Sequence, residues 1–150
     1  MKLESDDITD DEWLYRRVHE TRVANLPRVS PSAFEPRVKG TDPDVDGISL
    51  FRADCLADAE QVLEVIPAGP KRDANGLVKL RVSEVRELGI QVRSSANGVT
   101  PGHVSLVQLN SLAFKNAETR GECRDWMNKL SEICSTEERV VIVPASLRDT

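Results

Sequence analysis

The stretch GLVKLRVSEVRELG, residues 76–89, decides the fold. Apolar residues alternate with Lys79 and Arg81 over residues 77–82, which predicts a strand that buries one face. Ser83 is placed to cap a short helix, and Gly89 is placed to end it. A strand that passes directly into a short helix is typical of an α+β chain.

Five other segments are predicted to be extended, and the shortest of them is residues 90–93. Residues 13–18 fit either a helix opened by the capping box Thr9–Glu12 or a strand, and their aromatic side chains favour the strand. Residues 47–52 alternate in polarity, and residues 103–109 follow a Pro-Gly turn. Residues 139–143 form an uninterrupted apolar run before a proline, which predicts a strand buried within the sheet.

Two longer helices complete the prediction. One is expected from Asp54 to Ile66, before Pro67, and the long C-terminal one over residues 113–134. Its apolar stripe consists of Ala113, Ala117, Cys123, Met127, Leu130 and Cys134 or Ile133. Trp126 lies at the margin of this stripe, where ordinary packing is favoured over an exposed anchor. The fold class expected is a single α+β domain over residues 13–150, with a mixed or antiparallel sheet and one long C-terminal helix.

The charge is unevenly distributed along the chain. Residues 1–12 hold one basic and six acidic residues, so the net charge of −5 belongs to what we expect to be an acidic flexible tail. Residues 13–39 are basic and residues 40–64 are acidic. The excess of acidic over basic residues in the whole chain argues against a nucleic-acid partner. The favoured interpretation is that the two stretches are solvated faces that pair with each other. A second is that the basic stretch receives an anionic ligand or partner, and a third is that the acidic tail shields this basic surface.

The three cysteines have no metal-ligand spacing, and Cys123 and Cys134 are too far apart on one helix to form a disulfide. An odd number of cysteines without a secretory signal predicts a cytoplasmic protein. No apolar run is long enough to cross a membrane. The sequence pattern indicates no cofactor and does not decide the oligomeric state.

Residues 14–109, about two-thirds of the chain, resemble a group of small uncharacterised bacterial proteins. The resemblance rests on short motifs, namely LYRRV at 14–18, SAF at 32–34, GISL at 47–50, GLVKL at 76–80, VRELGIQV at 85–92 and PGHV at 101–104. It implies a bacterial protein and supports the strand at residues 14–18. It assigns no activity and no role to any residue.

One stretch has the form of a metal-binding loop. Asp42, Asp44 and Asp46 precede Gly47, as the first carboxylates of an EF-hand loop precede its glycine. The position that should hold a bidentate Glu is Ala53, and no helix is expected before the loop. A plain acidic turn is therefore favoured over Ca²⁺ binding, and we expect no metal.

Arg16, Arg17, His19 and Arg22 are the candidates for binding an anionic ligand or a partner, because they lie together in the basic stretch. The favoured function is that of an interaction or accessory module. The alternative is an enzyme whose polar site is assembled by the fold. Its catalytic candidates are Arg16, Arg17, Ser49 and His103.

The order of an arginine strand followed by a serine strand vaguely resembles ADP-ribosyltransferases. The resemblance implies NAD binding, with Arg anchoring the phosphates. The glutamate that such enzymes require has no clear counterpart, and Glu118, Glu122 and Glu138 are only nominal candidates. The other interpretation of His103 is that its ring orders the preceding turn.

Overall fold

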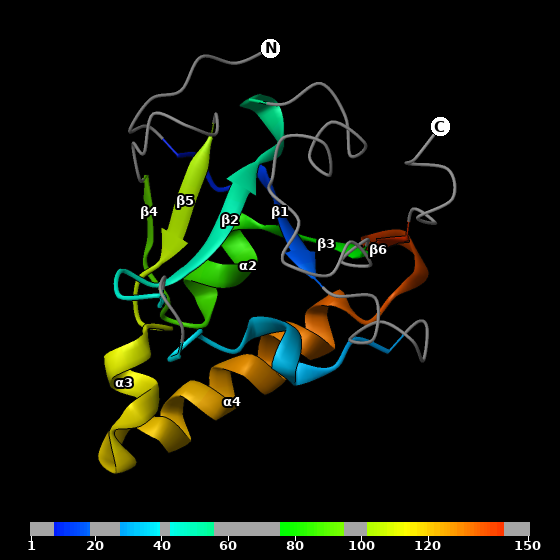
Figure 1. The fold of residues 1–150 in the computed structure, drawn as a ribbon. Coiled ribbons are helices and arrows are strands. Elements are labelled where there is room, and N and C mark those ends of the chain that lie inside the picture. The colour runs from blue at the N-terminus through cyan, green and yellow to red at the C-terminus, as the bar shows by residue number, and fades with distance from the viewer. Residues whose placement is uncertain (1–7, 19–27, 40–42, 56–75, 95–101, 143–150) are drawn as a thin grey trace, which may run out of the picture.

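A computed structural model describes residues 8–18, 28–39, 43–55, 76–94 and 102–142. The described strands form one sheet in the order β4–β5–β2–β1–β3–β6, and every neighbouring pair is antiparallel (Figure 1). The strands are β1 (Trp13–Val18), β2 (Ile48–Arg52), β3 (Gly76–Arg81), β4 (Val92–Ser94), β5 (His103–Leu106) and β6 (Val140–Ile142). The α+β fold class is therefore confirmed. Of the two expected kinds of sheet, mixed and antiparallel, the described strands form the antiparallel one.

The described helices lie between strands along the chain, one directly after β3 and the other two between β5 and β6. They are α2 (Val82–Glu87), α3 (Ser111–Lys115) and α4 (Ala117–Cys134), with 3-10 turns η2 (Pro31–Phe34), η3 (Ala53–Cys55) and η4 (Glu137–Arg139). The predicted strand at 77–82 is β3, and Gly89 ends the α2 region with a φ of +87°, as expected. Most of the helix predicted over residues 54–66 lies outside the described residues.

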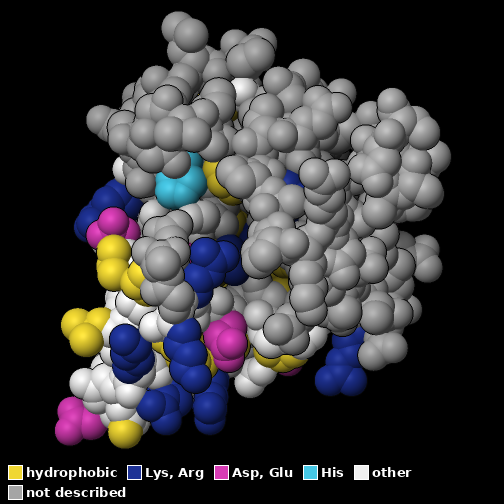
Figure 2. Space-filling model, viewed as in Figure 1, with side chains coloured by type: hydrophobic (Ala, Val, Ile, Leu, Met, Phe, Trp, Pro, Cys, Tyr) yellow, Lys and Arg dark blue, Asp and Glu magenta, His cyan; other side chains and the backbone are white. Residues whose placement is uncertain are grey.

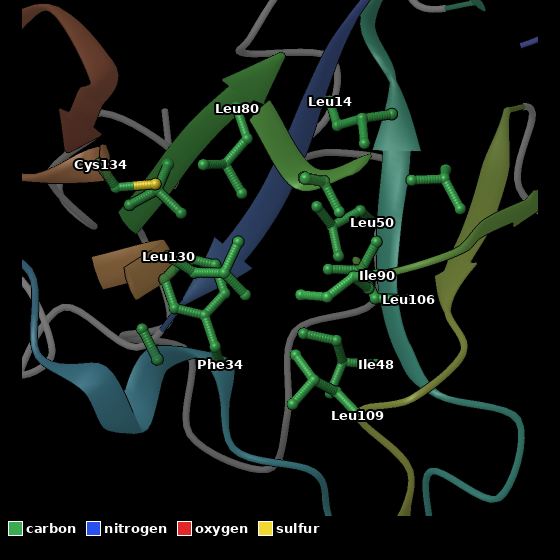
Figure 3. Packing of buried hydrophobic residues seen from close by; sticks show 14 of the residues in the cluster. Leu14, Phe34, Ile48, Leu50, Leu80, Ile90, Leu106, Leu109, Leu130 and Cys134 are labelled. Carbon is green, nitrogen blue, oxygen red and sulfur yellow. The ribbon is translucent and has the colours of Figure 1, made fainter. Parts of the chain in front are cut away.

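One face of the sheet forms the core with α4, α2 and η2. Leu14, Leu50 and Leu80 project from neighbouring strands and are fully buried. Figure 3 shows them in one cluster with Phe34 of η2 and Leu130 of α4. Strand alternation places the apolar side chains here and sends the intervening side chains to the opposite face.

The long C-terminal helix differs from its prediction because it breaks at Asn116. That residue is extended, with ψ at 123°, and its side-chain oxygen accepts a hydrogen bond from the Glu118 amide at 2.9 Å. The break separates α3 from α4 and leaves Ala117 exposed, whereas Cys123 of the predicted stripe is buried. Trp126 packs against the core and donates to the Leu88 carbonyl at 3.0 Å, so ordinary packing is confirmed.

Residues 8–12 are part of the domain, which corrects the boundary of the predicted acidic tail. Ile8 belongs to the core, and the buried Glu12 carboxylate is paired with Arg52. The capping-box contact forms, since the Thr9 amide donates to Glu12 at 2.7 Å. It closes a turn before β1 and does not open a helix. Any shielding by a tail is left to residues 1–7, which lie outside the described ranges.

Candidate functional site

The face of the sheet opposite the core carries basic, aromatic and small polar side chains, and we call it the Trp13 face. Register places its residues, since directly opposed side chains in antiparallel strands share a face. Its described strand residues are Trp13, Tyr15, Arg17, Ser49, Phe51, Leu77, Lys79, Arg81, Arg93, His103 and Ser105. They include four Lys or Arg residues and no carboxylate. A continuous row on this face runs across four strands, from Lys79 through Tyr15 and Phe51 to His103.

Ser49 and His103 meet near one end of the row. Ser49 on β2 lies two residues from Phe51, the partner of His103 on β5, so the two side chains are diagonal neighbours. The Ser49 hydroxyl and His103 Nε2 are 2.8 Å apart. The Phe51 ring packs edge-on against the imidazole, with centroids 5.3 Å apart. Ser49 and His103 are both half-buried.

Three cations surround the indole ring of Trp13 at the other end. Lys79 Nζ lies 4.9 Å from the ring centroid, Arg81 Cζ 4.2 Å and Arg139 Cζ 5.3 Å. The distances to one shared centroid mean that no two of these charged centres are more than about 10 Å apart. This upper bound on the separation of the three charges is close to the Debye length of about 8 Å at physiological salt. The repulsion between the three cations is therefore only partly screened. The indole attracts each cation and holds the cluster together.

Glu84 of α2 is the carboxylate bound to this cluster in the described part of the chain. Its Oε1 accepts hydrogen bonds from Arg139 Nη1 at 2.7 Å and from the Arg81 amide at 2.8 Å. Burial acts to raise the pKa of Glu84, but these bonds and the nearby positive charges outweigh it and lower the pKa below its usual value. One ionised carboxylate therefore interacts with two of the three cations, Arg139 and Arg81.

The two adjacent arginines of β1 have different roles. Arg16 projects to the core side, where it donates to the Ala33 carbonyl at 2.7 Å and to the Ser49 carbonyl at 2.9 Å. Burial lowers the pKa of Arg16 to about 10, although the charge of Asp44 partly opposes the shift, and the side chain stays protonated at neutral pH. Arg16 ties η2 to β2 and is left out of the site, whereas Arg17 lies on the Trp13 face.

Of the remaining predicted site residues, the structure describes Asp44 and Asp46, and neither belongs to the strands of the Trp13 face. His19, Arg22 and Asp42 lie outside the described residues. The Asp44 carboxylate accepts the Arg37 amide at 2.7 Å, and Asp46 is exposed. Within the described ranges, no three metal-ligating side chains are grouped.

The nominal glutamates of the NAD hypothesis are also placed away from Ser49. Glu118 and Glu122 are exposed on α4, which packs on the core side of the sheet. Glu138 is exposed on η4. Ser49 and Arg17 do share the Trp13 face, as that hypothesis requires, but none of these glutamates joins them.

The cysteines are buried fillers, as the sequence indicated. Cys55, Cys123 and Cys134 are not disulfide-bonded and are at most 1% exposed. Burial is the main reason that the pKa of Cys134 rises to about 12, and it also raises the pKa of Cys123. Thiols held protonated in this way are poor nucleophiles, so we assign them no chemistry.

The helical surface offers a useful contrast to the Trp13 face. Figure 2 shows Lys and Arg side chains gathered over the lower part of the molecule, where α3 and α4 lie, with Asp and Glu side chains among them. The exposed charged residues of α3 and α4 are Lys115, Glu118, Glu122, Arg124, Asp125, Lys129 and Glu132. Positive and negative side chains are mixed there, so we expect no strong binding of an anion to that surface.

Local sequence patterns do not reveal that one site holds Trp13, Lys79, Arg81 and Arg139. The alternation in residues 77–82 did place Lys79 and Arg81 on one side of a strand. Their meeting with Trp13 depends on the register between β1 and β3, which pairs Trp13 with Arg81. Register is a long-range property that no local motif reveals.

No helix in the described ranges is long and apolar enough to span a bilayer. No protein-family model, curated protein or solved structure matches the chain.

Proposed function

We propose that the protein binds a small molecule bearing a phosphate-like oxyanion, which lies on the Trp13 face against Lys79, Arg81 and Arg139. The protein would act as an accessory or interaction module, in which binding of this ligand is the central event. The resemblance to bacterial proteins and the buried cysteines without a disulfide support placing it in the cytosol of a bacterium.

The observation that carries the proposal is the convergence of three cations on one indole ring, where the carboxylate of Glu84 is bound to Arg139. Like charges at this separation repel, and an anion among them converts that repulsion into attraction. Lys and Arg together suit a phosphate, because guanidinium groups donate paired hydrogen bonds and the ammonium adds a mobile charge. The absence of carboxylates from the described strand residues of this face extends the favourable potential.

A protein partner has less support. The large hydrophobic residues that are strongly exposed in the described part are Val45 and Leu112. Two such side chains are a small apolar surface for a stable protein interface. The anionic ligand is therefore the better-supported form of the binding hypothesis.

Isothermal titration of the full chain with pyrophosphate tests the proposal. We expect saturable binding that weakens as NaCl is raised, because the contacts are electrostatic. Lys79→Gln should weaken binding about 10- to 100-fold, the equivalent of one charge-assisted hydrogen bond of about 1.5–3 kcal/mol. Lys115→Gln, which removes an exposed lysine of α3, is the matched control and should leave binding unchanged.

The proposal fails if pyrophosphate gives no saturable heat, or if both lysine variants weaken binding equally. NAD in place of pyrophosphate tests the enzyme alternative within the same experiment. Binding of NAD much tighter than that of pyrophosphate would favour a nucleotide site that includes Arg17 and Ser49, because they lie on the same face.

A further inference from the structure

We infer that Ser49 is a nucleophile activated by His103, and that the pair attacks the carbonyl carbon of small carboxylic esters. This goes beyond anion binding and rests on different residues. Its basis is the 2.8 Å contact between the Ser49 hydroxyl and His103 Nε2, which is the distance expected between a nucleophile and its general base.

The backbone positions of both residues are fixed by the pairing of their strands. Ser49 and His103 lie on the paired strands β2 and β5, and the direct partners around them are Phe51 with His103 and Ser49 with Ser105. Strand positions hold side chains more rigidly than loops do, and a rigid pair needs little reorganisation before reaction. Phe51 adds a second constraint, because its edge-on contact at 69° restricts rotation of the imidazole.

The chemistry needs only the pair, an ester and water. Ser49 Oγ attacks the carbonyl carbon and forms a new C–O bond, while its proton passes to His103 Nε2. The bond from the carbonyl carbon to the alcohol oxygen then breaks, and His103 returns the proton to the departing alcohol. Water, deprotonated by His103, hydrolyses the acyl-serine and restores the hydroxyl. Every proton taken up by His103 is given back within the cycle.

Accessibility separates this serine from its neighbour on the same face. Ser49 is half-buried, whereas Ser105 is only 3% exposed. Arg93 on β4 pairs with Ser105, the direct partner of Ser49, and is exposed. A positive charge two strands away favours esters that carry an anionic group over neutral ones.

Labelling of the folded full-length chain with a fluorophosphonate tests the inference, because serine attack on phosphorus expels fluoride and leaves a stable adduct. Peptide mass spectrometry should find the adduct on Ser49. Ser49→Ala should abolish it, and Ser105→Ala, the matched control, should retain it. His103→Gln keeps a polar side chain but cannot take up the proton, so the labelling rate should fall roughly 100-fold or more. Phe51→Leu should give an intermediate rate.

Circular dichroism identifies any variant that does not fold, and the location of the adduct in the wild-type protein decides the question without variants. An unlabelled Ser49 in the wild-type protein overturns the inference. Labelling of Ser49 at the wild-type rate in a folded His103→Gln protein does so too, because the hydrogen bond would then be structural only. Pyrophosphate binding is measured separately, so either proposal can fail alone.

Discussion

Glu12 and Arg52 form an ion pair in which both side chains are buried. Arg52 Nε and Nη2 donate to the two carboxylate oxygens at 2.8 and 3.0 Å, a bidentate geometry. The Thr9 amide donates to the same carboxylate, so the N-terminal turn is fastened to β2. A buried pair of this kind adds little net stability when intact, but loss of one partner leaves a buried charge uncompensated.

We therefore expect Glu12→Gln to lower the free energy of unfolding by about 3–5 kcal/mol. Urea denaturation measures the change. Asp11→Asn is the matched control, because Asp11 is an exposed acid of the same turn, and its effect should stay within about 0.5 kcal/mol. Equal effects of the two variants would show that the buried pair does not fasten the turn.

Glu84 makes the free energy of unfolding depend on pH in the acidic range. Its pKa in the folded protein lies below its ordinary value of 4.5, so the unfolded chain binds the proton more tightly. Its contribution is thus fully present above pH 4.5 and is lost as the pH falls through the folded pKa. The stability difference between the wild-type protein and Glu84→Gln should be constant at pH 6–8 and shrink below the ordinary pKa. A difference that grows in acid would contradict this assignment.

At the scale of elements, two glycines have opposite roles. Gly47 enters β2 with a φ of +117°, and a Cβ there would lie 2.2 Å from the Leu106 carbonyl oxygen. Both the conformation and the close approach of β5 require glycine. Gly121 lies within α4, where a Cβ would meet nothing within 4 Å. Glycine inside a helix carries only its entropic cost.

Gly47→Ala should therefore destabilise the protein by at least about 2 kcal/mol. Gly121→Ala should stabilise it by about 0.5–1 kcal/mol. Thermal unfolding should show a lower melting temperature for Gly47→Ala and a higher one for Gly121→Ala than for the wild-type protein. A tolerated Gly47→Ala would mean that β2 and β5 do not approach as closely as described.

Most elements could be predicted from the sequence because alternation is local. Residues 77–82 alternate cleanly and form β3, and the aromatic residues 13–18 form β1. The break at Asn116 could not be seen in the same way. Helical spacing of apolar residues continues across it, and the break depends on one capping side chain. The pattern identified the buried side of the helix but missed its discontinuity.

At the scale of the whole molecule, the site depends on strand order. Chain order would not place β1 between β2 and β3, yet this arrangement brings Trp13 beside Arg81 and Tyr15 beside Phe51. Neighbouring strands are about 4.8 Å apart, so the row from Lys79 to His103 spans roughly 14 Å. Ser49 and His103 are separate candidates in the sequence, Ser49 because a serine strand follows an arginine strand and His103 because it follows a Pro-Gly turn. Their contact joins residues 54 positions apart and requires the fold.

The two tryptophans report on the two sides of the sheet. Trp13 lies within the cation cluster, whereas the Trp126 indole is fixed to the Leu88 carbonyl on the helical side. Their two indole N–H signals in a ¹⁵N–¹H NMR spectrum can be assigned with a Trp13→Tyr variant. Titration with pyrophosphate should shift the Trp13 indole signal progressively and leave the Trp126 signal in place. A Trp13 signal that stays fixed at saturating pyrophosphate, or a shift confined to Trp126, would contradict the proposed anion site.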